Sequence, residues 1–195
     1  MINHVLAICT GVENLALSIP AYGLDFLENP QAGGNLRKLT IKLCQFRPLG
    51  PGPNFYHSCF AQLTHLHLLD DDGHWPTYAG WERLINLTHL ALARSGPAAG
   101  IPQLMQRLPN IRYVALGQYN TSEDEKYTDA SIIYHSVLRP TWGVRVVLFW
   151  EIPQHDWERG ARGEGDFWDL VEREVERRIE KESGRLDCPR KVFCK

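Results

Sequence analysis

Three histidines near the middle of the chain are the residues whose type and spacing could support chemistry. His65 and His67 flank one leucine in Leu63-Thr-His-Leu-His-Leu68, and His89 takes the place of His65 in a second phrase, Leu87-Thr-His-Leu-Ala-Leu92. Three neutral imidazoles around an open fourth position are a known ligand set for catalytic zinc. Histidines can equally belong to a polar recognition surface that needs no metal, so the sequence leaves two interpretations of the same residues.

The elements that carry the histidines decide whether the rings can converge. In a β-strand alternate side chains share one face, about 7 Å apart, and neighbouring strands lie about 4.8 Å apart. If the two phrases form adjacent strands, all three imidazoles therefore lie on one face. The sequence places no carboxylate to orient the rings, as metal-ligating histidines usually require. We therefore favour a binding surface over a metal-dependent enzyme, assign no catalytic residue and expect no cofactor.

The doubled phrase belongs to a longer series with the spacing L-x-x-L-x-L. Five copies are centred at positions 15, 39, 66, 90 and 114, at steps of 24, 27, 24 and 24 residues. This spacing and period are typical of leucine-rich repeats, in which each copy forms one strand and the copies stack. The sequence predicts a single α/β domain over residues 1–195, a short horseshoe-shaped solenoid with a parallel sheet on its concave side. The repeats occupy about residues 4–117.

The segments between the repeats are expected on the convex side as short helices or turns. Three of them place apolar residues three or four apart, as amphipathic helices do: Pro53–Phe60, Tyr78–Ile85 and Ile101–Leu108. Strands joined in this way form right-handed parallel crossovers.

The C-terminal part follows a different pattern. Residues 143–150 are rich in β-branched and aromatic side chains and predict an irregular last strand. Residues 166–182 predict a helix that caps the solenoid, since an exposed last repeat would aggregate. Its apolar stripe is expected to comprise Phe167, Leu170, Val171, Val175 and Ile179, with surface charge pairs Asp169–Arg173 and Glu174–Arg178.

Composition narrows the classes of partner and compartment. The formal net charge is −2, so no overall positive field attracts nucleic acid or an anionic membrane. The five cysteines are irregularly spaced and contain no C-x-x-C pair, which fits a reducing compartment, cytoplasm or nucleus. We therefore expect a protein or peptide partner, and neither nucleic acid nor a membrane.

The side chains beside each central leucine define the predicted binding surface. The residue before it gives Asn14, Lys38, His65, His89 and Tyr113, and the residue after it gives Ala16, Thr40, His67, Ala91 and Ala115. Small residues in one column beside large polar ones in the other predict a shallow groove. We expect the partner to be bound by Lys38, Thr40, His65, His67, His89 and Tyr113.

The five copies, together with Asp156-Trp-Glu-Arg-Gly-Ala-Arg-Gly-Glu-Gly-Asp-Phe-Trp168, resemble the leucine-rich-repeat part of the F-box-type proteins of mushroom-forming fungi. The resemblance spans roughly residues 4–182. It implies the substrate-recognition half of a ubiquitin-ligase receptor. In that family an N-terminal F-box module docks on a Skp-type adaptor, but this chain begins almost directly in the first repeat, so adaptor binding is not expected here.

Overall fold

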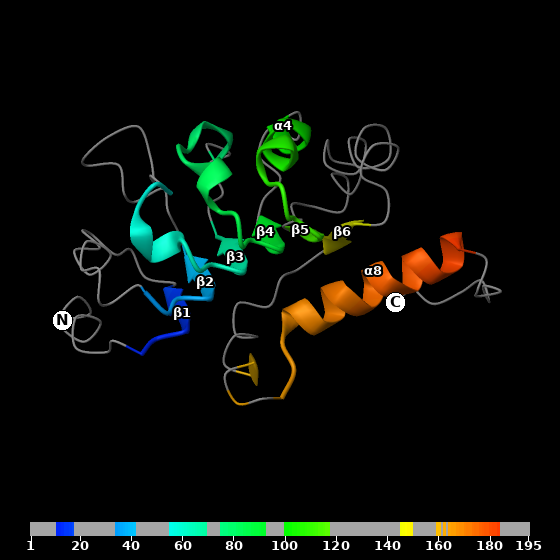
Figure 1. Cartoon of the computed structure of the whole chain (residues 1–195). Coiled ribbons are helices and arrows are strands. Elements are labelled where there is room, and N and C mark those ends of the chain that lie inside the picture. Colours follow the sequence, from blue (N-terminus) through cyan, green and yellow to red (C-terminus); the bar gives the residue numbers. More distant parts are fainter. Residues whose placement is uncertain are drawn as a thin grey trace, which may run out of the picture.

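The computed structural model describes residues 11–17, 34–41, 55–69, 75–92, 100–117, 145–149, 159–160, 162 and 164–183. Within them the chain is an α/β protein built on a six-stranded, all-parallel sheet in the sequential order β1 to β6 (Figure 1). The strands are β1 Asn14–Leu17, β2 Lys38–Ile41, β3 His65–Leu68, β4 His89–Leu92, β5 Tyr113–Gly117 and β6 Val146–Phe149.

The register of the sheet follows the repeated sequence phrase. The central residues of the five copies pair side by side across the strands: Leu15, Leu39, Leu66, Leu90 and Val114. The last strand continues the series, with Val146 opposite Val114. The predicted strands, and which residues share each face, are therefore confirmed. We call the face with the flanking polar side chains, Lys38 and His65 among them, the histidine face, and the opposite one the leucine face.

The leucine face carries the main core and is covered by the connecting segments. These are α4 (Gly100–Arg107) and three 3-10 turns, η2 (Ser58–Phe60), η3 (Trp75–Thr77) and η4 (Trp81–Arg83). Trp75 and Trp81 are fully buried there, and the Trp81 indole N–H donates to the Trp75 carbonyl oxygen at 3.0 Å. Leucines of the strands thus gain partners that no single copy could supply.

Of the three connecting segments expected as short helices or turns, one forms an α-helix and two contain 3-10 turns. The segment predicted at 101–108 forms α4, whereas those predicted at 53–60 and 78–85 contain single 3-10 turns. Gly80 explains why the segment at 78–85 contains only a short turn, because its φ of +82° is left-handed and interrupts helical backbone at that point. A Cβ at this position would also lie 2.7 Å from the Tyr56 backbone nitrogen.

The C-terminal helix α8 (Phe167–Glu182) has the predicted bounds. It begins with a capping box, in which the Asp166 carboxylate accepts from the helix backbone and Asp169 accepts from the Asp166 N–H at 2.7 Å. The predicted pair Glu174–Arg178 is present at 2.7 Å. Arg173, expected to pair with the Asp169 carboxylate, donates instead to the Asp169 carbonyl oxygen.

The buried side of α8 differs from the predicted stripe. Leu170 and Ile179 are 45% and 49% exposed, whereas Trp168 is only 7% exposed. Trp168 joins Phe167, Val171 and Val175 in a second apolar cluster, together with Ala91, Ala115 and Val147 of the sheet. Because Trp168 is larger than Leu170, turning the helix to bury it removes more apolar surface from water.

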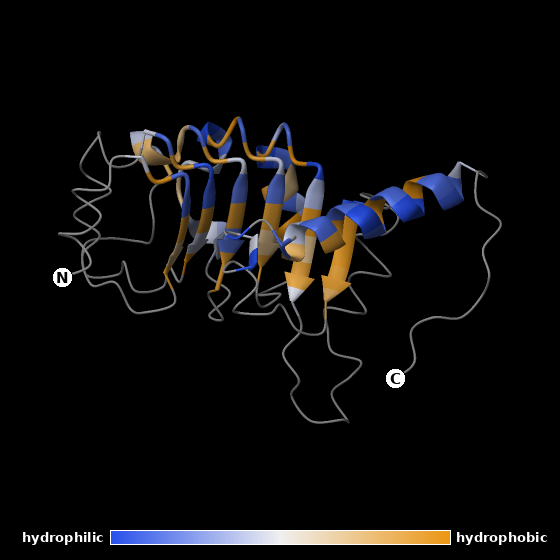
Figure 2. Cartoon of the chain, turned by 90° about the horizontal axis from the view of Figure 1, so that it is seen from below, coloured by the Kyte–Doolittle hydropathy of each residue, from blue (hydrophilic) through white to orange (hydrophobic). Residues whose placement is uncertain are grey.

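Helix α8 therefore packs on the histidine face, opposite the connecting segments (Figure 1). It crosses β5 and β6, and its C-terminal part extends beyond the edge of the sheet (Figure 2). The predicted groove is consequently not open along its whole length, because the small side chains of Ala91 and Ala115 receive the helix.

Some expectations fall outside the described residues, among them the start of the repeat region and four of the five cysteines. No helix in the described ranges has the length and apolar character needed to cross a membrane.

Candidate functional site

A stack of three rings runs along the histidine face. The His65 and His89 rings lie nearly parallel with centroids 3.9 Å apart, and Tyr113 stacks on His89 at 4.5 Å. All three residues precede the central residue of their copy, and the in-register parallel strands place them side by side. The stack thus follows directly from the repeated phrase.

Trp168 of α8 packs across this stack. Its ring meets His65 edge-on at 5.3 Å and His89 at 5.4 Å. One aromatic side chain therefore holds the histidines from the helix side and excludes water from them, which leaves His89 only 6% exposed.

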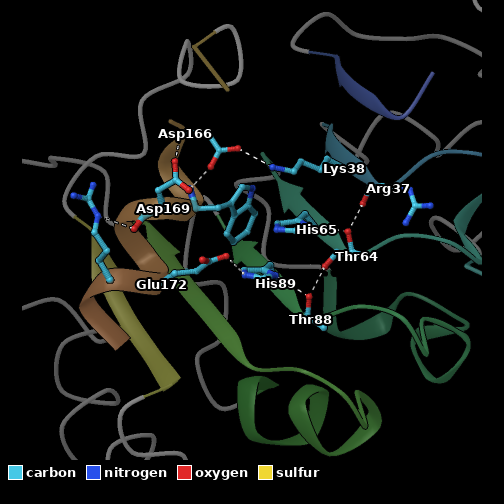
Figure 3. Close-up of polar contacts among 11 residues, drawn as sticks. Arg37, Lys38, Thr64, His65, Thr88, His89, Asp166, Asp169 and Glu172 are labelled. Atoms are coloured by element: carbon cyan, nitrogen blue, oxygen red, sulfur yellow. Dashed lines mark hydrogen bonds and ion pairs between the residues drawn. The ribbon is translucent and has the colours of Figure 1, made fainter. Parts of the chain in front are cut away.

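Glu172, one helical turn after Trp168, brings a carboxylate to the histidines. Its Oε1 lies 2.9 Å from Nε2 of His89, and the two residues are 83 positions apart in the chain (Figure 3). His65, His89 and Glu172 each present a ligand atom, and these atoms lie within 4.8 Å of one another. We call these three residues the His–Glu group.

Two threonines bind the other side of the imidazoles. Thr64 Oγ1 lies 2.8 Å from Nδ1 of His65, and Thr88 Oγ1 lies 2.7 Å from Nδ1 of His89. The same hydroxyls also reach backbone carbonyl oxygens of the residues just before β2 and β3, at 3.1 Å for Arg37 and 3.2 Å for Thr64 (Figure 3). Each hydroxyl can therefore donate to the ring or accept from it, and either ring tautomer is satisfied.

Burial keeps both imidazoles neutral. It lowers the pKa of His65 to about 3, and the repulsion that a protonated His65 would meet from His89 and Lys38 adds to the shift. It lowers the pKa of His89 to about 4. Burial and nearby carboxylates raise the pKa of Glu172. Both shifts disfavour an imidazolium–carboxylate ion pair, so the 2.9 Å contact is a hydrogen bond made by a neutral His89 ring and not a salt bridge.

An ion pair joins the beginning of α8 to β2, beside the His–Glu group. Lys38 Nζ lies 2.9 Å from the Asp166 carboxylate, which also accepts the Trp168 backbone N–H as the helix N-cap. Lys38 is half-exposed and Asp166 is mostly covered. The helix is therefore held to β2 through Asp166 and to β4 through Glu172.

His67 does not belong to the His–Glu group, although the sequence left open a ligand set of His65, His67 and His89. Its side chain is 7% exposed and stacks on Phe167 at 6.1 Å. Its Nε2 is buried and has no hydrogen-bond partner among the described residues. Burial lowers the pKa of His67 to about 4. His67 and His89 are thus covered by α8, whereas the sequence predicted them on an open surface.

The accessible part of the histidine face within the described residues lies over the first strands. Asn14 is exposed, and Ala16, Lys38 and Thr40 are half-buried. Figure 2 shows that α8 lies at the opposite end of the sheet from β1 and β2. Of the six residues predicted to bind a partner, Lys38 and Thr40 lie at this end, and Tyr113 is half-buried beside the helix.

Sequence reasoning did not identify Glu172, Asp166 and Trp168 as neighbours of the histidines. Asp166 is the N-cap of α8, and this local role is separate from its contact with Lys38. The sequence does contain one indication of which side of α8 packs on the sheet, the adjacent aromatic residues Phe167 and Trp168. Both side chains can be buried only if the helix turns so that Leu170 faces solvent.

No family model, curated protein or solved structure matches this chain.

Proposed function

We propose that the chain is a leucine-rich-repeat recognition module that binds a protein or peptide on its histidine face. The observation that carries the proposal is the in-register series of repeat strands, which presents two columns of side chains on one surface. Consecutive stacked copies with one strand each are the usual architecture of such modules, and their side-chain columns commonly provide the contact surface.

The position of α8 limits the binding surface that we propose. The helix and the ring stack occupy the part of the face over β3 to β6, so the contact surface lies over β1 and β2 and comprises Asn14, Ala16, Lys38 and Thr40. His65, stacked under Trp168, forms its inner border. His89 then contributes by holding the helix, and not by touching the partner.

The resemblance to fungal F-box-type proteins suggests a class of partner. In such receptors the repeats hold the protein that is to be ubiquitylated, and we propose this recognition role for the present chain. The support is the repeat spacing and period of the sequence. The Skp-type adaptor is not part of this proposal.

Photocrosslinking tests the proposed surface. A benzophenone amino acid at Thr40 should give a discrete adduct with a protein from host-cell extract, whereas the same group at Gln103, exposed on α4, should not. Excess unlabelled wild-type protein should compete for the adduct, and the Ala16→Arg variant should not. Equal adducts from both positions, or equal competition by both proteins, would contradict binding at this surface.

A further inference from the structure

We propose that His65, His89 and Glu172 form a binding site for a divalent transition-metal ion of the zinc type. The ligand atoms of these residues lie within 4.8 Å of one another, and they come from β3, β4 and α8. A bound ion would join the helix to two strands. This inference goes beyond the recognition function, because it concerns the part of the histidine face that α8 covers.

The donor set decides the class of ion. Two imidazoles and one carboxylate suit zinc or ferrous iron, whereas magnesium and calcium prefer oxygen ligands throughout. The same set leaves a position for a fourth ligand at a tetrahedral ion. No cysteine belongs to the group, so a thiolate is not among the ligands in the described part of the chain.

The hydrogen bonds behind the rings are those that metal-ligating histidines need. Such a histidine normally donates its other ring N–H to an acceptor that fixes the tautomer. Thr64 and Thr88 supply this acceptor for His65 and His89, at 2.8 and 2.7 Å, when each hydroxyl turns its proton to the carbonyl oxygen behind it. Nδ1 then carries the proton, and the Nε2 lone pair is free for the ion.

The same hydroxyls also provide hydrogen bonds for the rings when no ion is bound. There the hydroxyl of Thr88 donates to Nδ1, and the Nε2–H of His89 donates to the Glu172 carboxylate at 2.9 Å. Binding of the ion replaces this hydrogen bond with two metal–ligand bonds. The ring proton moves from Nε2 to Nδ1 by exchange with solvent, so that the imidazole remains neutral throughout.

The surroundings of the group favour an ion in two ways. Trp168 and Tyr113 enclose the rings with apolar surface, which strengthens electrostatic attraction by excluding water. Lys38, which would repel a cation, is ion-paired with Asp166.

The near-parallel rings, 9° apart, must tilt to direct both lone pairs at one ion. His65 is less buried than His89 and is the ring that we expect to turn.

Calorimetric titration of the untagged, chelator-treated 195-residue chain with Zn²⁺ tests the site. We expect one equivalent to bind, with the affinity falling at least about tenfold in Glu172→Gln, since even losing an outer contact of a metal site has this effect. Glu176→Gln is the matched control, because Glu176 is exposed one turn further along α8 and makes the same change in charge. Equal affinity of the two variants, or no binding by the wild type, would overturn the proposal.

A Co²⁺ spectrum identifies the ligands directly. The wild type should show visible ligand-field bands without a near-ultraviolet thiolate band, and His65→Gln, which changes a half-exposed residue, should lose them. A thiolate band would overturn the proposal by assigning the ion to cysteines. Circular dichroism establishes that each variant is folded, and Zn²⁺ at one fixed concentration should raise the Tm of the wild type more than that of Glu172→Gln.

Discussion

Lys38 on β2 and Asp166 at the start of α8 meet at 2.9 Å although 128 positions separate them in the chain. Asp166 has two functions there, because its carboxylate also caps the helix at the Trp168 N–H. The two functions can be separated by substitution.

Asp166→Ala should lower the free energy of unfolding by about 1–2 kcal/mol, since it removes both the N-cap and the ion pair. Asp166→Asn keeps an oxygen for the cap and should cost about 1 kcal/mol or less, since the ion pair it removes is still partly open to solvent through Lys38. Urea denaturation measures both values. Lys38→Met is the control, because it removes the ion pair and leaves the cap. If it lowers the free energy of unfolding as much as Asp166→Ala does, the cap contributes nothing to stability.

Trp168 should dominate the docking of α8. Replacing it with alanine removes a buried ring that contacts both histidines and should cost about 3 kcal/mol or more. Amide hydrogen exchange in α8 should accelerate more than exchange in β2 and β3. Leu170→Ala is the comparison within the same helix. Leu170 was predicted to be buried but is 45% exposed, so this change should alter stability by less than about 0.5 kcal/mol.

Stability should fall as the pH is lowered from about 6.5 to about 4. Burial lowers the pKa of His67 from 6.5 to about 4, so between these values the unfolded chain binds more protons than the folded one. The contribution of neutral His67 to the free energy of unfolding is therefore fully present above pH 6.5 and is lost as the pH falls towards 4. For His67 alone the loss is on the order of 3 kcal/mol. Urea unfolding at a series of pH values measures it.

The variant His67→Leu isolates this contribution from other titrating groups. It should reduce the slope of stability against pH within that window. At pH 7 it should be stabilising by about 1 kcal/mol, because it removes a buried Nε2 that has no partner among the described residues. A slope identical to that of the wild type would mean that His67 is charged or solvated in the folded protein.

Cys59 should be unreactive in the folded protein. It is 1% exposed in the leucine-face core, and burial raises the pKa of its thiol to about 12. Since the thiolate is the reactive form, iodoacetamide at pH 8 should leave Cys59 unmodified until the chain unfolds. Mass spectrometry of the peptide that carries Cys59, with and without urea, measures the labelling. Equal labelling in both conditions would place Cys59 outside the core.

The repeated phrase by itself determined the first five strands, their order and their register. The reason is that leucines at a fixed spacing must share one face of a strand, and neighbouring copies must stack to bury them. For the same reason the stack of His65, His89 and Tyr113 follows from their equivalent places in three copies. The extent of α8 also followed from sequence, because its cap and its periodicity are local.

Only the tertiary structure decided where α8 lies and what it brings to the histidines. Helical periodicity shows that a side of α8 is apolar, but it does not say which surface receives that side, and burial of Trp168 turned the helix away from Leu170. That rotation places Glu172 against His89 and Asp166 against Lys38. Contacts between residues 83 and 128 positions apart leave no local pattern, because they arise from the packing of two complete elements.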